Sequence, residues 1–232
     1  MTSGEDVRVS RAWAVVAVVA WFGVVATVLL SGLGWYAQIP PEPGLYGDTG
    51  DGAYGALQRV VDTFSYFTIW SNIVVAVTAT LLARGSDGPR TRVLLLDALL
   101  MITVTGIVYQ LLLAPSIDVQ GWSLLTDPVL HVVTPLLTLA VWAWAGPRGW
   151  LTVRLLPLSL VVPLLWVVWM LARGAVIDAY PYAFVAANER GYPAALATIA
   201  AILVFGLVVA AVLTAVDRVL SRPRPAQPAQ GR

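Results

Sequence analysis

The chain of 232 residues contains no cysteine and no lysine, and its only histidine is His131. The absence of cysteine excludes disulfides, thiolate metal centres and a cysteine nucleophile. One histidine is too few for a histidine-rich metal site, so we predict neither a metal ion nor another cofactor. The formal net charge of +1 gives no basis for nucleic-acid binding.

Charged residues are scarce throughout the chain, and hydrophobic residues are abundant. Charged residues make up 12% and hydrophobic residues 59% of the sequence, and the mean hydropathy is +0.79. Several continuous apolar runs reach about 20 residues, the length that crosses about 30 Å of hydrocarbon as a helix. These runs do not alternate polar with apolar residues, as the strands of a membrane barrel do. We therefore predict an all-α polytopic membrane protein with six transmembrane helices.

The sequence divides into three parts. Residues 1–11 form a short polar N-terminus, residues 12–216 the six-helix transmembrane domain, and residues 217–232 a tail whose Pro, Arg and Gln content predicts disorder. The six spans are expected at 12–33, 61–83, 93–114, 128–145, 155–172 and 193–216.

Proline and glycine give the finer predictions. Residues 34–59 are rich in both and read as a loop. Asp127 followed by Pro128 is typical of a helix cap and first helical residue, so the fourth helix is expected to start there. Pro163 predicts a kink in the fifth span, because proline removes a backbone hydrogen bond.

The arginines orient the chain in the membrane. Eleven of the fourteen lie in the N-terminus, in the loops at 84–92 and 146–154, and in the tail. The positive-inside rule then places both termini in the cytoplasm (N-in/C-in), in a multi-pass protein of the plasma membrane. A basic set made only of arginine, beside abundant Ala, Val and Leu, suggests a GC-rich bacterial genome.

Residues 64–72 carry hydroxyls and a carboxamide where a membrane helix normally carries Leu and Val. Such groups are costly in hydrocarbon unless they find partners or have a function. In a continuous helix, Ser65, Thr68 and Asn72 would lie on one face. Thr68 is then a candidate nucleophile, with Ser65 and Asn72 beside it as substrate-binding residues. The alternative is that these side chains bond helix carbonyls and hold helices together.

His131 is expected at the outer end of the fourth span, at about the depth of Thr68. Its ordinary pKa of about 6.5 suits a base near neutrality. A neutral histidine within hydrogen-bond distance of a threonine takes the hydroxyl proton during attack on a carbonyl. Asp127, four residues earlier, is placed to orient the ring, or else simply caps the helix. An interfacial histidine bonded to a loop carbonyl or to water is the alternative.

Four aromatic residues are further candidates for substrate contacts. Trp166 and Trp169 lie in the fifth span, and Tyr180 and Tyr182 lie in the loop that follows it. Indole and phenol groups can line a pocket mouth and donate hydrogen bonds. Packing at the membrane interface is the competing explanation for each of them.

Three segments together resemble a known family. They are Phe-Thr-Ile-Trp-Ser-Asn at 67–72, Asp-Pro-Val-Leu-His at 127–131 with Pro135 close behind, and Trp-Val-Val-Trp at 166–169 followed by Tyr-Pro-Tyr-Ala-Phe at 180–184. In this order the segments resemble the bacterial six-pass membrane proteins called the Pr-six-Pr family. That family is distantly similar to the eukaryotic androgen-induced and androgen-dependent membrane proteins. The resemblance covers about 12–216.

The resemblance implies an activity. The eukaryotic members are intramembrane threonine hydrolases that cleave fatty-acid esters of hydroxy fatty acids, and their essential threonine and histidine match Thr68 and His131. A hydrolase of this kind attacks a lipid ester with Thr68 and uses His131 as base and then acid. Asn72 or an indole N–H stabilises the oxyanion. Membrane lipids and a fatty-acyl ester are the partners expected, whereas the sequence does not point to any protein partner.

Two other functions compete with hydrolysis. A non-catalytic membrane module that binds lipid or a partner would use the same polar patch without turnover. A small-solute transporter is the third, but it would want charged residues at mid-membrane, where this chain is apolar.

Overall fold

The computed structural model describes residues 3–36 and 49–221, which contain helices and no strand. The all-α prediction is therefore confirmed for these residues. Five helical segments are long and apolar enough to cross a membrane, and a sixth is counted if the bent pair α2 (Gly52–Thr63) and α3 (Phe67–Ala83) is taken as one span. Of the loop predicted at 34–59, residues 37–48 lie outside the described residues, as does the tail beyond 221. The prediction is wrong for residues 52–59, which are helical and belong to α2.

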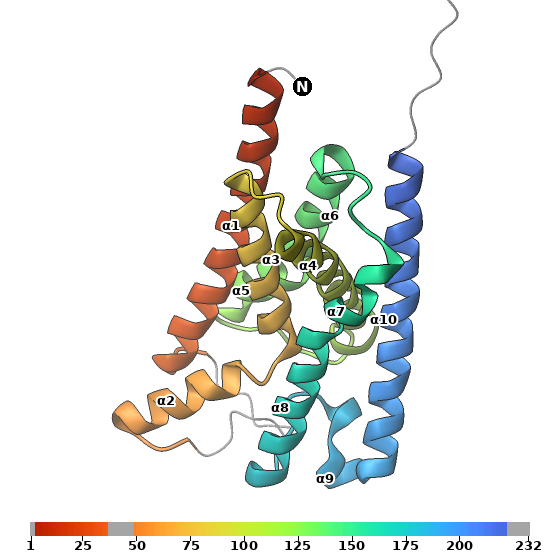
Figure 1. Ribbon diagram of the computed structural model, residues 1–232. Helices are drawn as coiled ribbons and strands as arrows, with labels where there is room; N and C mark the ends of the chain where they lie inside the picture. The colour runs from red at the N-terminus through yellow and green to blue at the C-terminus, as the bar shows by residue number, and fades with distance from the viewer. Residues whose placement is uncertain (1–2, 37–48, 222–232) are drawn as a thin grey trace, which may run out of the picture.

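The helices that could span the membrane stand side by side, with the start of α1 and the end of α10 at the same end of the bundle (Figure 1). Two of them are single helices, α1 (Ser3–Gly32) and α10 (Tyr192–Leu220), whereas α4 (Pro89–Val108) and α8 (Val161–Ile177) are the longest helices of two spans that also contain shorter helical segments. α1 begins ahead of the expected residue 12, and α10 runs to Leu220, four residues past the predicted end at 216.

The core is apolar and centres on α4, which packs against α3 (Phe67–Ala83), α6 (Thr134–Ala145) and α10. Its most deeply buried side chains include Leu95, Leu99 and Ile102, which are 0% exposed. Because lipid is as apolar as these side chains, close packing rather than exclusion of water holds such helices together.

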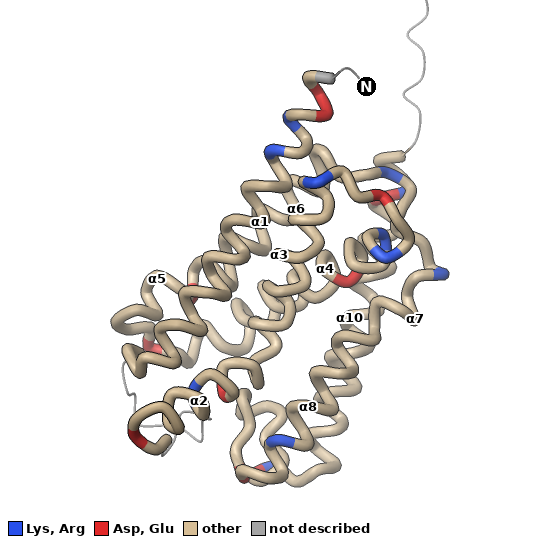
Figure 2. Tube along the Cα trace, turned by 60° about the vertical axis from the view of Figure 1, so that its left-hand side comes forward, with Lys and Arg blue, Asp and Glu red and all other residues tan. Residues whose placement is uncertain are grey.

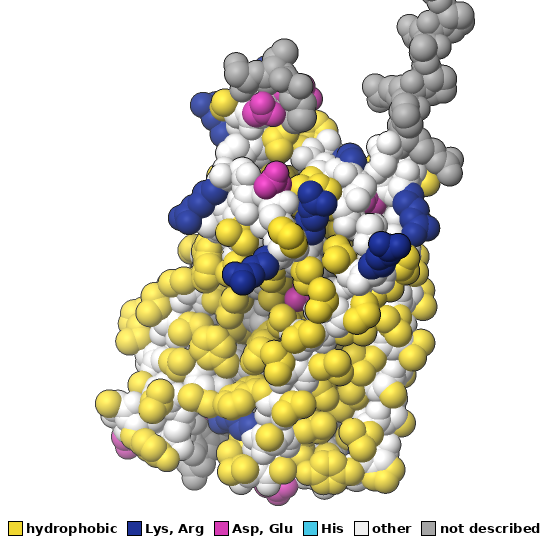
Figure 3. Space-filling view, in the orientation of Figure 1, with side chains coloured by type: hydrophobic (Ala, Val, Ile, Leu, Met, Phe, Trp, Pro, Cys, Tyr) yellow, Lys and Arg dark blue, Asp and Glu magenta, His cyan; other side chains and the backbone are white. Residues whose placement is uncertain are grey.

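Charge is concentrated at the two ends of the bundle. Figure 2 shows most of the arginines at the end that carries the N-terminus, and Figure 3 shows dark blue side chains there above a broad yellow band. Apolar side chains are exposed around this band, among them Val18, Leu136, Val168 and Val208. A belt of exposed hydrocarbon between two polar ends is the surface of a multi-pass membrane protein.

The second span is not one helix, contrary to prediction. α2 (Gly52–Thr63) and α3 meet at an angle of 77°, and the break falls at residues 64–66. Two indoles accompany the break: Trp70 Nε1 donates to the carbonyl of Phe64 at 2.7 Å, and Trp166 Nε1 donates to that of Ser65 at 2.9 Å. Because a buried carbonyl without a donor is costly, these bonds stabilise a broken backbone that apolar periodicity alone would not reveal.

The fourth span also differs from its prediction. It begins at Ser123, so Asp127 is no cap and Pro128 lies inside the helix. The span consists of α5 (Ser123–Pro128), a π-helical turn η2 (Val129–Val133) and α6. The third span ends in a similar way, since α4 continues into the π-helical turn η1 (Tyr109–Leu113).

The fifth span is interrupted close to Pro163. It comprises the 3-10 turn η3 (Val153–Leu155), the short α7 (Leu156–Ser159) and α8. The break at Leu160 follows from the missing N–H of Pro163, which leaves the carbonyl of Ser159 without its α-helical donor. After α8 come the 3-10 turn η4 (Ala183–Val185) and α9 (Ala187–Arg190), which connect to α10.

Candidate functional site

Thr68 and His131 meet although 63 residues separate them in the chain. The Oγ1 atom of Thr68 lies 3.0 Å from Nε2 of His131. Thr68 stands in the first turn of α3, directly after the break, and its side chain is 6% exposed. The structure thus brings together the two residues that the sequence proposed as nucleophile and base.

The partner of the second ring nitrogen, Nδ1, determines which nitrogen of the neutral His131 ring carries the proton. Nδ1 lies 3.1 Å from the backbone carbonyl oxygen of Asp127, which only accepts hydrogen bonds. A neutral ring therefore carries its proton on Nδ1 and presents a lone pair at Nε2. The Thr68 hydroxyl donates to that lone pair, which is the arrangement a general base requires.

The carboxylate of Asp127 has a different partner. Tyr109 donates its hydroxyl to Asp127 Oδ2 at 3.1 Å, whereas Asp127 Oδ1 lies 3.9 Å from the His131 ring nitrogen. The phenol ring of Tyr109 stacks on the imidazole, with 3.8 Å between centroids and 13° between planes. Asp127 thus orients His131 through its backbone carbonyl, and the Tyr109 ring packs against one face of the imidazole.

The backbone around His131 departs from a regular helix. Pro135 has no N–H, so the carbonyl of His131 gains no α-helical bond, and the turn from 129 to 133 is π-helical. Tyr109 begins the other π-helical turn. Single π turns inside membrane helices often accompany functional sites, because they rotate one side chain out of the helical register.

Two glycines let neighbouring helices approach this turn. A Cβ on Gly23 of α1 would lie 2.9 Å from Leu130 Cδ2, which is too close. A Cβ on Gly106 of α4 would lie 3.3 Å from Pro135 Cβ. The small residues on both sides allow α1 and α4 to close around η2, which fixes the position of His131.

Asn72 connects the two segments that carry Thr68 and His131. It is 0% exposed, and its Nδ2 donates to the carbonyls of Thr68 and Leu130, at 2.9 Å and 3.2 Å. Asn72 thereby connects the first turn of α3, which carries Thr68, to Leu130, the residue before His131. With its N–H groups already engaged, Asn72 holds α3 against η2 and has no donor free for an oxyanion.

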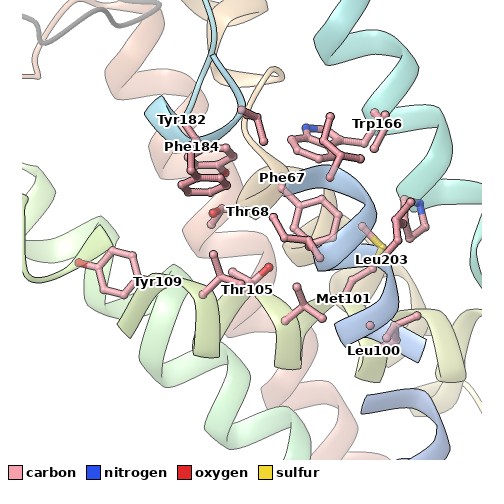
Figure 4. Close-up of a pocket in the computed structure, with 18 of the residues that line it drawn as sticks. Phe67, Thr68, Leu100, Met101, Thr105, Tyr109, Trp166, Tyr182, Phe184 and Leu203 are labelled. Atoms are coloured by element: carbon pink, nitrogen blue, oxygen red, sulfur yellow. The ribbon is translucent and has the colours of Figure 1, made fainter. Parts of the chain in front are cut away.

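An apolar cavity opens beside Thr68 (Figure 4). Its walls come from α4 with η1, from α8, from α10 and from the loop that contains η4. In Figure 4, Tyr182 and Phe184 lie to one side of Thr68, and Leu100 and Met101 lie at the opposite side of the cavity. Thr68, Thr105 and Tyr109 are its main polar contributors, while the remaining walls are hydrocarbon and aromatic rings.

The other predicted substrate-binding residues divide into two groups. Trp166 and Tyr182 line the cavity. Ser65, Trp169 and Tyr180 do not: Ser65 lies in the helix break, and Trp169 is 36% exposed on α8. The expected single face of Ser65, Thr68 and Asn72 is thus absent, because the helix starts after Ser65.

Tyr180 packs against α8. A Cβ on Gly174 would lie 2.2 Å from its ring, so that glycine makes room for it. Its hydroxyl lies 3.4 Å from that of Tyr192, and burial raises the pKa of Tyr180 to about 12. A neutral, packed phenol of this kind anchors the loop that carries Tyr182.

Sequence reasoning missed Tyr109 and the α10 wall of the cavity. A tyrosine near the end of an apolar span was a usable signal, since a buried phenol needs a partner. The α10 wall consists of apolar residues that carry no such signal. Among residues 3–36 and 49–221, no group of three His, Asp or Glu side chains is arranged to hold a metal ion.

No family model, curated protein or solved structure matches this chain.

Proposed function

We propose that this protein is an intramembrane hydrolase that cleaves fatty-acyl esters, with Thr68 as nucleophile and His131 as general base. The observation that carries the proposal is the 3.0 Å contact between Thr68 Oγ1 and His131 Nε2 beside an apolar cavity. The resemblance to the eukaryotic threonine hydrolases points to the same pair.

The reaction runs in two steps. Thr68 Oγ1 attacks the ester carbonyl while Nε2 takes its proton, and the tetrahedral intermediate expels the alcohol, which receives that proton from His131. An acyl-threonine remains. Water, activated by the same nitrogen, then attacks the acyl group, and the released Thr68 oxygen regains its proton from His131. The carbonyl of Asp127 keeps the ring in the required tautomer throughout.

The start of α3 supports the negative charge of the intermediate. The indole N–H of Trp166 and the amide N–H groups of Asn72 are occupied by carbonyls. Phe67 and Thr68 are the first two residues of α3, where backbone N–H groups have no intrahelical acceptor. These two backbone N–H groups stand at the positive end of the helix, in the same turn as the Thr68 hydroxyl, and this position suits an oxyanion.

The site is assigned to the outer leaflet of a bacterial plasma membrane. Both ends of the described chain emerge at the arginine-rich end of the bundle, and the positive-inside rule makes that end cytoplasmic. The bent pair α2 and α3 then counts as the sixth span, which gives the N-in/C-in topology. Acyl chains enter from the bilayer, and water reaches the acyl-threonine from outside.

Tyr109 gives a graded test of the site. Tyr109→Phe keeps the ring that stacks on His131 and should leave the hydrolysis rate within about threefold, because the hydroxyl bonds only Asp127. Tyr109→Ala removes the stack, and a loosened ring should lower kcat by roughly 10²-fold. Rates with a fluorogenic acyl ester in proteoliposomes decide this. Equal rates for the two variants would show that the stack has no part in positioning His131.

A lipid-binding protein without turnover is the second candidate, and the cavity itself favours it. The two candidates separate with a fluorophosphonate probe, which reacts with an activated hydroxyl. The hydrolase is labelled, and hydrolyses esters, in a Thr68-dependent manner. A protein that only binds lipid is neither labelled nor active, although it still takes up fatty acid.

A further inference from the structure

The cavity beside Thr68 extends along α4 and α10, away from the loop that contains η4. Along α4 its innermost lining residue is Leu100, and along α10 it is Gly206. These two residues face each other, since a Cβ built on Gly206 would lie 3.6 Å from Leu100 Cδ1. Figure 4 places Leu100 on the opposite side of the cavity from Tyr182 and Phe184. Leu100 and Gly206 therefore form the cavity floor.

Gly206 is not required by helix packing. Glycine inside a helix costs about 1 kcal/mol relative to alanine. Close helix contact usually explains such a glycine, as it does at Gly23, but at Gly206 the nearest heavy atom would be at an ordinary contact distance from an added Cβ. The missing side chain leaves open volume at the bottom of the cavity instead.

The depth of the cavity follows from helix geometry. Tyr109 lies beside His131 and hence near the level of Thr68. From Tyr109 to Leu100, the chain advances nine residues, or about 13 Å at about 1.5 Å per residue. A fully extended chain advances about 1.2 Å per bond, so about eleven bonds fit in this depth.

We propose that Leu100 and Gly206 set an upper limit on acyl-chain length, and that the protein takes medium-length acyl groups of about twelve carbons, in keeping with the depth estimated from the helix rise. The inference rests on the proposed function for the reaction, although the length limit itself concerns binding. The ester carbonyl lies at Thr68, and the methyl end of the chain reaches the floor.

Hydrolysis of p-nitrophenyl esters from four to sixteen carbons provides the first test, with purified protein in proteoliposomes. We expect the wild-type rate to peak at about twelve carbons. Gly206→Leu fills the floor and should move the peak at least four carbons shorter, whereas Leu100→Ala deepens it and should move the peak longer. Val208→Leu, which enlarges a side chain on the lipid-exposed side of α10, serves as control and should not move the peak.

A binding test separates failure of the length limit from failure of the proposed function. In the Thr68→Ala background, the rise in Tm caused by saturated fatty acids of graded length should peak at the same lengths, with the same shifts in Gly206→Leu and Leu100→Ala. Absence of hydrolysis by the wild type, with these binding profiles intact, would overturn only the hydrolase. Profiles that coincide in all variants would overturn the length limit. Because Gly206→Leu and Leu100→Ala should shift the profile in opposite directions, the test still decides if one of the two variants misfolds.

Discussion

Replacing Thr68 by alanine should lower ester hydrolysis by about 10³-fold or more, and replacing His131 by alanine should do the same. Each change removes one half of the pair joined by the 3.0 Å contact, and in the proposed mechanism each residue needs the other. For the same reason, the Thr68→Ala/His131→Ala double variant should be no slower than either single one. Steady-state rates in proteoliposomes measure all three.

Two control variants accompany this measurement. Thr68→Ser keeps a hydroxyl and should retain activity within about tenfold, since only a methyl group is lost. Thr138→Ala is a matched threonine deletion in α6, where the buried hydroxyl bonds the carbonyl of Thr134 within its own helix. It should leave the rate unchanged. A Thr68→Ala variant with wild-type rates would remove Thr68 from the mechanism.

Replacing Arg173 by methionine should lower the free energy of unfolding by about 3 kcal/mol. The Arg173 guanidinium pairs with the carboxylate of Asp62 and donates to Ser65 Oγ at 3.3 Å. Asp62 is 2% exposed, so removal of its partner leaves a buried carboxylate without a counter-charge. The pair ties α8 to the break from which α3 and Thr68 begin, and activity should fall together with stability.

A second substitution tests whether the unpaired Asp62 carboxylate causes the loss of stability in Arg173→Met. Asp62→Asn in the Arg173→Met background removes the unpaired carboxylate and should recover part of the lost stability. Thermal unfolding in detergent, followed by tryptophan fluorescence, gives the ranking. If the double variant is less stable than Arg173→Met alone, the unpaired charge is not what destabilises the single variant.

Much of the fold is readable from the sequence because a bilayer imposes simple rules. Runs of apolar residues located the helices that can span it. The missing N–H of Pro163 predicted a kink in the fifth span, and the helix is interrupted nearby, at Leu160. The break at residues 64–66 was not readable. It depends on indole N–H groups of Trp70 and Trp166 bonding freed carbonyls, and the second of these lies about a hundred residues away.

The candidate site divides in the same way. Chemistry and the family resemblance together selected Thr68 and His131: a hydroxyl and the only imidazole were expected at similar depth, and the resemblance matched the same two residues. The roles of their neighbours depend on backbone geometry: a π-helical turn aims His131, and a backbone carbonyl orients its ring. Asn72 looked like an oxyanion donor as a free carboxamide, but both of its bonds go to carbonyls. Tertiary contacts decide such assignments.

Peptide mass spectrometry after fluorophosphonate treatment tests the central claim most directly, because it locates the activated hydroxyl. The proposed mechanism predicts a phosphonyl adduct on Thr68 in the wild type and none at that position in His131→Ala, whose threonine lacks its base. An adduct on a different residue, such as Ser71 beside it, or equal labelling of Thr68 in His131→Ala, would contradict the assignment of Thr68 and His131 as nucleophile and base.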